Sequence, residues 1–211
     1  MNNMQKNFTT WAVSVLLIFS AGCSSIAPKD PASRDLVPVK TIGVLPTYIA
    51  SHLQQDSKNL ATLEAGAETI NAILENYFQN YENISLISQT ELEGLSYADA
   101  NRPFYLAREA GEKLHYDAVL IPSITRFQER DGSEYAVITP ASVAFSLKLL
   151  AVEQGQIIWN VDFDQVQKPL LENILPKTRS TGSGFRWLTA TELTKAGINK
   201  KLESCPYLKR E

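Results

Sequence analysis

Two neighbouring stretches in the second half of the chain, residues 143–149 and 157–163, alternate between apolar and polar side chains. A period of two predicts strands with one buried face. For the two apolar sets to share that face, Leu149 must lie opposite Trp159, which leaves a three-residue loop closed by Gly155. The pattern therefore predicts a β-hairpin around which the rest of the chain is organised. Its inward residues would be Val143, Phe145, Leu147, Leu149, Ile157, Trp159, Val161 and Phe163.

Helical periodicity is present on both sides of this hairpin. Apolar residues recur at i, i+3, i+4 and i+7 over residues 64–81, which predicts an amphipathic helix. A second stripe, rich in alanine, follows Pro103 and predicts a helix that packs closely on a sheet. A last helix to about Leu202 is predicted by Thr189 and Glu192, which are spaced as a capping box.

Short apolar runs predict the remaining strands. They occupy residues 39–45, 84–87 and 118–121, and the last run is apolar at every position, as in a strand covered on both faces. Asp131 and Gly132 form a dipeptide that favours a tight hairpin turn. The order β-α-β-α-β-β-β-α predicts an α/β fold: a single domain with a mixed parallel and antiparallel sheet and helices packed on it.

The N-terminus carries a secretory signal. Lys6 precedes an apolar run at 11–19 that is far shorter than the roughly 20 residues of a membrane-spanning helix. Small residues then lead to Cys23, an arrangement that resembles the lipobox of bacterial lipoproteins, although Ser20 stands where leucine is usual. We therefore expect residues 1–22 to be a lipoprotein signal peptide, with ordinary secretion as the alternative.

Lipidation of Cys23 would fix the compartment. Acyl chains such as palmitate on this residue would hold the protein at a membrane surface. By the resemblance to Gram-negative lipoproteins, Ser24 favours the outer membrane, with the protein facing the periplasm. Residues 23–38 then form the lipidated cysteine and an extended, proline-containing tether, residues 39–203 an α/β periplasmic domain, and residues 204–211 a tail.

The charge and the second cysteine narrow the range of partners. Without the signal, 19 basic residues stand against 23 acidic ones, a net charge of −4. The longest basic run is Lys200 with Lys201, so we expect no nucleic acid partner. Cys205 has no second thiol in the mature chain except Cys23. It is expected to be an incidental thiol in a mobile tail, or else an intermolecular link.

Three segments together resemble a known superfamily of bacterial envelope lipoproteins: VKTIGVLP, YDAVLIPSITRF and FSLKLLAVEQGQIIW. Its members include the curli transport component, the lipoprotein activators of peptidoglycan synthases and the N-terminal domain of the Tol translocation protein. The resemblance covers about residues 39–163 and implies a mixed sheet with a role in binding or assembly rather than catalysis. Curli-type pores insert strands of about ten alternating residues, and neither 128–134 nor 166–186 fits that pattern, so we expect no pore.

Reactive groups are few. His52 and His115 are the only histidines, and neither lies in a nucleophile-elbow pattern, so a periplasmic hydrolase using one of them is the alternative rather than the leading hypothesis. We expect no metal site and no cofactor. Asp162 and Asp164 lie on the polar face of their strand with Lys148 diagonal to Asp162, which favours a solvated ion pair over a catalytic carboxylate pair.

Exposed aromatic residues are the more informative candidates. Phe104, Tyr105, Phe185 and Trp187 lie in or beside predicted loops, where rings often anchor a partner. For Trp187, which immediately precedes a predicted helix, core packing is the default interpretation. The segment 165–187 is hypothesised to pack across the sheet or against a neighbouring subunit. The sequence thus favours a protein-binding or self-assembling accessory factor in envelope biogenesis or export, with an envelope protein or a homo-oligomer as its partner.

Overall fold

The computed structural model describes residues 36–50, 57–96, 102–133, 136–167 and 187–208. The chain divides into two compact units, residues 1–36 and 37–211. Apart from Leu36, every described residue belongs to the second unit. The signal peptide, Cys23 and most of the expected tether therefore lie outside the described residues.

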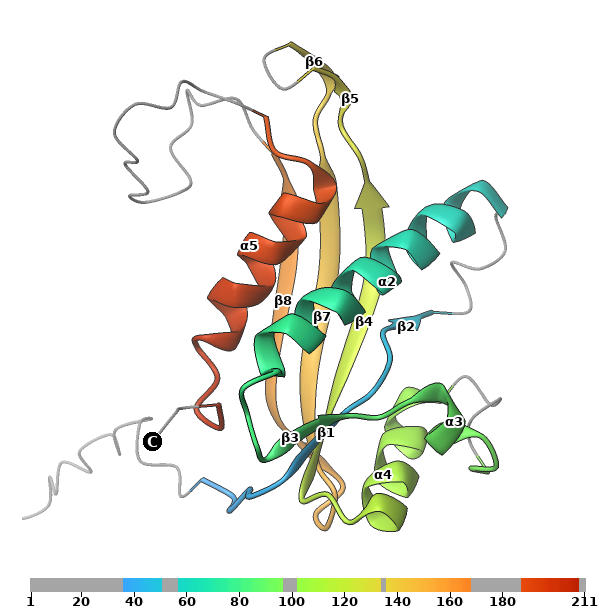
Figure 1. The fold of residues 1–211 in the computed structure, drawn as a ribbon, viewed down its shortest axis with the longest axis vertical. Coiled ribbons are helices and arrows are strands. Elements are labelled where there is room, and N and C mark those ends of the chain that lie inside the picture. Colours follow the sequence, from blue (N-terminus) through green and yellow to red (C-terminus); the bar gives the residue numbers. More distant parts are fainter. Residues whose placement is uncertain (1–35, 51–56, 97–101, 134–135, 168–186, 209–211) are drawn as a thin grey trace, which may run out of the picture. The chain divides into compact units, whose positions relative to one another are not determined.

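A mixed sheet with the strand order β3-β1-β4-β7-β8 forms the centre of the second unit (Figure 1). β1 pairs in parallel with β3 and β4, and the short β2 also pairs in parallel with β4. β7 is antiparallel to both β4 and β8. The strands are β1 (Ile42–Val44), β2 (Tyr48–Ile49), β3 (Ile84–Leu86), β4 (Ala118–Gln128), β7 (Ser142–Ala151) and β8 (Gln156–Val166).

The described helices pack on this sheet, so the predicted α/β fold with a mixed sheet is confirmed. α2 and α5 contribute to one apolar cluster, in which the stripe of α2 is buried at Ile70, Leu74 and Phe78. α3 and α4 contribute to a second cluster. The helices are α2 (Ser57–Phe78), α3 (Gln89–Leu92), α4 (Pro103–Leu114) and α5 (Ala190–Leu202).

β4 separates the two clusters, as its uninterrupted apolar run predicts. Leu120 and Ile124 face α2, whereas Val119 and Ile121 face α4. Both helices approach the sheet at a glycine. A Cβ atom at Gly66 of α2 would lie 2.4 Å from the Cδ1 atom of Ile124. The absence of a side chain there allows α2 to lie directly on β4.

The hairpin of β7 and β8 has the predicted register over most of its length, with Leu149 opposite Trp159. A register shift follows, so Leu150 pairs with Ile157 and the loop has four residues, 152–155, rather than three. Gly155 ends the loop with a φ of 62°, as expected. The bulge has one further consequence: Ile157 is exposed, contrary to the prediction, and Ile158 packs on the core instead.

A small two-stranded ribbon extends beyond the ends of β4 and β7. It consists of β5 (Asp131–Gly132) and β6 (Val137–Thr139). The prediction that Asp131 and Gly132 form the turn was wrong, because both residues are paired and the chain reverses after them. Gly132 has a φ of 104°, and a Cβ atom there would lie 2.3 Å from the carbonyl oxygen of Ala136. Glycine is therefore required by the ribbon and not by the turn.

Cys205 is a core residue, which contradicts the expectation of a thiol in a mobile tail. The residue is 2 % exposed, and Tyr207 and Leu208 after it pack against the core cluster of α2 and α5. Burial raises the pKa of the Cys205 thiol to about 11. An accessible thiolate is needed for an intermolecular disulfide, so the structure also disfavours the alternative of an intermolecular link.

Candidate interaction surfaces

The described helices cover one side of the sheet only in part. α4 packs there against the first half of β4 and the last half of β7, through the cluster that includes Val119 and Leu150. The second half of β4, β7 from Ser142 to Lys148, and β8 form what we call the open face. Its side chains come from Ser123, Arg126, Ser142, Ala144, Ser146, Lys148, Asn160, Asp162 and Asp164.

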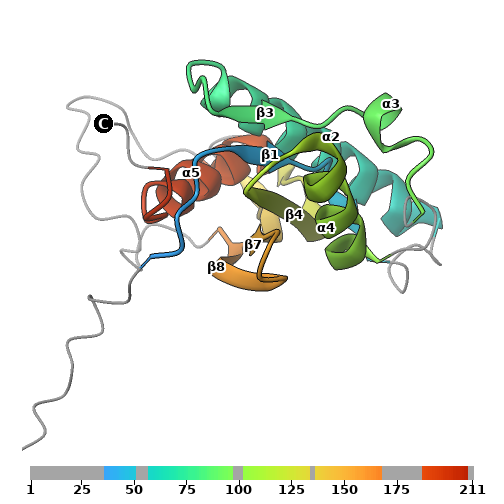
Figure 2. The same ribbon diagram turned by 90° about the horizontal axis from the view of Figure 1, so that it is seen from below.

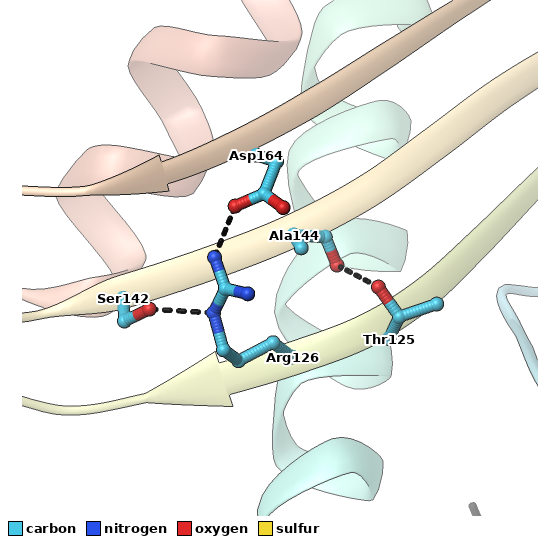
Figure 3. Close-up of polar contacts among 5 residues, drawn as sticks. All are labelled: Thr125, Arg126, Ser142, Ala144 and Asp164. Atoms are coloured by element: carbon cyan, nitrogen blue, oxygen red, sulfur yellow. Dashed lines mark hydrogen bonds and ion pairs between the residues drawn. The ribbon is translucent and has the colours of Figure 1, made fainter.

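Arg126 crosses the open face from one strand to the next but one (Figure 3). Its Nε donates to Ser142 Oγ on β7 at 2.5 Å, and its guanidinium forms an ion pair with Asp164 on β8. A register shift in β4 beside Thr125 precedes this contact. Ser142 and Ala144 are buried beneath these side chains, although no described helix covers them. Sequence patterns alone do not indicate this contact, since it requires the register between β4 and β7.

The centre of the open face differs from the expected ion pair. Asp162 lies opposite Ser146, but Ser146 hydrogen-bonds across to Ser123 on β4 with an Oγ–Oγ distance of 2.7 Å. The ammonium of Lys148 lies 5.3 Å from the centre of the Phe104 ring instead of pairing with Asp162. Asp162 has neither an ion pair nor a hydrogen bond among the described residues.

Two of the predicted aromatic residues form an exposed pair at the start of α4. Phe104 is 42 % and Tyr105 56 % exposed. Each ring has a cation beside it, since the guanidinium of Arg102 lies 5.8 Å from the Tyr105 ring and Lys148 lies over Phe104. Proline at the first helical position places both rings in the first turn, beside the open face. The two rings are therefore suited to an apolar contact with a partner, and the cations of Arg102 and Lys148 lie beside that contact.

Of the other two predicted aromatic residues, Trp187 does not join this pair. Trp187 is half-buried just before α5, and its carbonyl accepts a hydrogen bond from Arg130 Nη1 at 2.7 Å. Phe185 lies outside the described residues. We call the contacts of Glu129, Arg130 and Gln167 with residues 187–190, between β8 and α5, the neck. In the neck, Leu188 N also donates to Gln167 Oε1 at 2.8 Å. Glu129 completes the neck by accepting from Ala190 N, the first backbone donor of α5.

The capping box predicted for α5 is confirmed. Thr189 Oγ1 accepts from Glu192 N at 3.1 Å, and Glu192 accepts from Thr189 N at 3.0 Å. These bonds fix where α5 begins.

Asp117 ties the first residues of the second unit to the central strand. Its carboxylate accepts hydrogen bonds from the backbone N–H groups of Thr41 and Lys40, both at 2.9 Å, and its own N–H donates to Thr41 Oγ1. The hydrogen bonds from Thr41 and then Lys40 hold the pKa of Asp117 below its usual value. The Asp117 carboxylate therefore has a structural role, as the acceptor of hydrogen bonds from Lys40 and Thr41.

A shallow pocket of about 400 Å³ lies at the C-terminal end of α4 and contains His115. His115 ends the helix in a left-handed conformation with φ 61°. Its pocket is lined by Pro38, Gly111, Glu112, His115, Tyr116, Asp117, Val152, Glu153 and Gln154. None of these residues is a serine, threonine or cysteine, so this described pocket lacks the hydroxyl or thiol of a serine- or cysteine-type hydrolase.

Two further expectations concern sites of other kinds. His52, the other histidine of the hydrolase alternative, lies outside the described residues. Among the residues that the structure describes, no three His, Cys, Asp or Glu side chains lie close enough together to hold a metal ion. A search of the same residues for a long apolar helix found none that could cross a membrane.

Comparison with known proteins gives matches in structure only. No protein-family model matches the chain, and no curated protein matches it in sequence. Among solved structures, the PelC dodecamer from Paraburkholderia phytofirmans is 12 % identical, with a TM-score of 0.43 and coverage of 84 % of this chain and 94 % of that one. The LpoB C-terminal domain from Salmonella enterica is 18 % identical, with a TM-score of 0.38 and coverage of 63 % and 87 %.

A third similar structure is the lipoprotein GNA1162 from Neisseria meningitidis. It is 16 % identical, with a TM-score of 0.30 and coverage of 78 % of this chain and 98 % of that one. At such identities the likeness concerns the course of the chain and not its activity.

Proposed function

We propose that this chain is an outer-membrane lipoprotein, anchored through Cys23 and facing the periplasm, that binds a protein in support of envelope biogenesis or export. The observation that carries the binding role is the exposed ring pair of Phe104 and Tyr105, with a cation beside each ring. Large exposed rings are costly in water and are frequent anchors of protein interfaces. The partner is an envelope protein or a second copy of the chain.

The anchoring is supported by the sequence around Cys23. Replacement of Cys23 by serine should abolish labelling with palmitate and release the protein from membranes. Ser24→Asp should leave the protein lipidated but shift it from the outer to the inner membrane, because sorting in well-studied Gram-negative bacteria depends on that position. Labelling of Cys23→Ser to the level of the wild type would contradict the proposal.

The binding role is tested by crosslinking in intact envelopes. The double variant Phe104→Ala and Tyr105→Ala should lose the crosslinked species, whether a partner or an oligomer. Ile138→Ala is the matched control, because Ile138 is 81 % exposed on β6, away from α4. Equal crosslinking of the double variant and the wild type would show that the ring pair is not the contact.

A hydrolase using His52 or His115 remains the alternative from another class. The variant His52→Ala with His115→Ala discriminates between the two functions. The binding role predicts an unchanged phenotype, since it assigns no part to either histidine. The enzymatic alternative predicts loss of function with an unchanged thermal unfolding curve.

A further inference from the structure

β8 forms one end of the sheet, and no strand lies along its outer edge within the described part of the chain (Figure 2). The N–H of Gln167 donates to the carbonyl of Ala141, directly opposite in the register of β7 and β8. Hydrogen-bonded and non-hydrogen-bonded pairs alternate in antiparallel strands. The N–H and C=O groups of Asn160, Asp162 and Asp164 therefore point away from β7, towards the outer edge.

The apolar side of β8 is incompletely covered at this edge. Trp159 and Val161 pack against the core but stay half-buried, whereas their partners on β7, Leu149 and Leu147, are at most 1 % exposed. The difference arises because, among the described strands, the sheet ends at β8, which leaves one flank of Trp159 and of Val161 without a neighbouring strand. Apolar side chains of an added strand would cover these flanks.

The other side of β8 carries negative charge. Asp162 is exposed and has no ion pair or hydrogen bond among the described residues. Asp164 pairs with Arg126 but is still 70 % exposed in its side chain. Cations on the same side of an added strand would lie beside both carboxylates, an arrangement that stabilises strand pairing.

We propose that the outer edge of β8 binds an extended segment of a partner protein whose side chains alternate between apolar and basic residues. The apolar residues of that segment would lie beside Trp159 and Val161, and its basic residues beside Asp162 and Asp164. Backbone hydrogen bonds to the outward groups of β8 would supply affinity, and the alternating side chains would supply specificity. This inference rests on the proposed protein-binding function and names the kind of segment bound.

Two antiparallel pairings of this edge with a second copy of β8 are unfavourable. If two antiparallel copies were centred on Asp162, the two Asp162 carboxylates would face each other. If they were centred on Phe163, Asp162 would face Asp164 of the other copy. Like charges directly opposite each other destabilise strand pairs. The same carboxylates also protect an exposed edge against self-association, and the experiment must separate that role from recognition.

The test uses the full chain, purified in detergent, and synthetic nine-residue peptides. The first peptide alternates valine and lysine. The second and third peptides have the same sequence but carry N-methyl groups on alternate amides. The second is methylated along one edge of the extended peptide and the third along the other, so each peptide has one edge that cannot pair with a strand. The last alternates valine and glutamate. Binding is measured by titration, and hydrogen exchange is followed at the amides of Asn160, Asp162 and Asp164.

The valine–lysine peptide should bind and slow exchange at these three amides by about tenfold or more at saturation, because an outward N–H becomes protected only when it is paired. At least one N-methylated form should fail to bind, and the glutamate peptide should not bind. Asp162→Lys should weaken binding of the lysine peptide roughly tenfold, since attraction at two or three cross-strand positions becomes repulsion. Glu75→Lys, an exposed reversal on α2, is the matched control and should change nothing.

Several outcomes overturn the inference: no binding of the lysine peptide, binding without protection of the three amides, unchanged binding of both N-methylated forms, or equal binding of the glutamate peptide. Any of these would leave the carboxylates with a protective role only. The proposed function would fail separately, through loss of dependence on Phe104 and Tyr105 in envelope crosslinking. The two failures are therefore distinguishable.

Discussion

Arg126 on β4 forms an ion pair with Asp164 on β8, two strands away, and donates to Ser142 on the strand between them (Figure 3). One side chain thus connects three strands on a side of the sheet that no described helix covers at this point. The pair is partly exposed, with 37 % of the Arg126 side chain and 70 % of the Asp164 side chain accessible. Its electrostatic part is consequently screened by water, and much of its value lies in the packing of the Arg126 stem over Ala144.

We therefore expect the two partners to contribute unequally. Arg126→Ala should lower the free energy of unfolding by about 1–2 kcal/mol, because it removes the pair, the bond to Ser142 and the packing. Asp164→Asn should cost less than about 1 kcal/mol. Urea denaturation measures both, with Lys195→Ala on the exposed side of α5 as a control. A larger loss from Asp164→Asn than from Arg126→Ala would contradict this division.

At Gly66, α2 lies close against β4. Alanine in a helix is ordinarily more favourable than glycine by about 1 kcal/mol. At Gly66, however, a Cβ atom would lie 2.4 Å from Ile124 and 2.7 Å from Phe127, so Gly66→Ala should destabilise the protein by about 1–3 kcal/mol. Thermal unfolding measures this change. The exposed neighbour gives the control, since Ala65→Gly should cost only about 1 kcal/mol, and stabilisation by Gly66→Ala would refute the close packing.

Asp117 predicts a dependence of stability on acid. Its pKa is lowered in the folded state by hydrogen bonds from Thr41 and Lys40, so its contribution is complete above the unfolded-state pKa near 3.8 and is lost as the pH falls through the lower folded value. Asp117→Asn should reduce the loss of stability below about pH 4, as measured by urea midpoints at a series of pH values.

The pKa of Glu91 is lowered in the same direction by hydrogen bonds from Ser88. Glu91→Gln is therefore the comparison that isolates the contribution of Asp117. An acid dependence that is the same in Asp117→Asn and the wild type would mean that the bonds to Thr41 and Lys40 do not stabilise the fold.

Cys205 should react slowly in the native state. Because the thiol is buried and its pKa is raised to about 11, little thiolate is accessible at about pH 8. Labelling with a maleimide should be slow in buffer and fast in urea, and a non-reducing gel should show no disulfide-linked dimer through this residue. Rapid native labelling, or a dimer that reduction removes, would restore the idea of an intermolecular link.

Sequence reasoning was most informative where side-chain period and fold agree. The alternation in β7 and β8 predicted the pairing of Leu149 with Trp159, and the capping pair of Thr189 and Glu192 predicted the start of α5. It failed at Ile157, because a bulge shifts the alternation without leaving a mark in the residue types. The turn expected at Asp131 failed for a related reason, since Gly132 is needed for a local close approach within the ribbon.

The contacts of the candidate surfaces were harder to foresee than the fold. Phe104 and Tyr105 could be selected as exposed rings near a helix start, and both are exposed. Lys148 beside Phe104 and Arg126 beside Asp164 join elements distant in sequence, and such pairs need the strand order β4-β7-β8 before they can be inferred. The burial of Cys205 likewise depends on how the last residues fold back after α5.

Hydrogen bonds in the neck between β8 and α5 bring the end of β8 and the start of α5 together. Gln167 holds Leu188, Arg130 holds Trp187 and Glu129 holds Ala190, so both ends of that stretch are fastened to the body of the domain. A sequence inserted between positions 167 and 187 would therefore connect two ends that the domain already holds together. The loss of entropy on closing the loop would then increase only slightly with the length of the insert. A foreign peptide or a reporter tag grafted there should leave the domain's melting behaviour almost untouched.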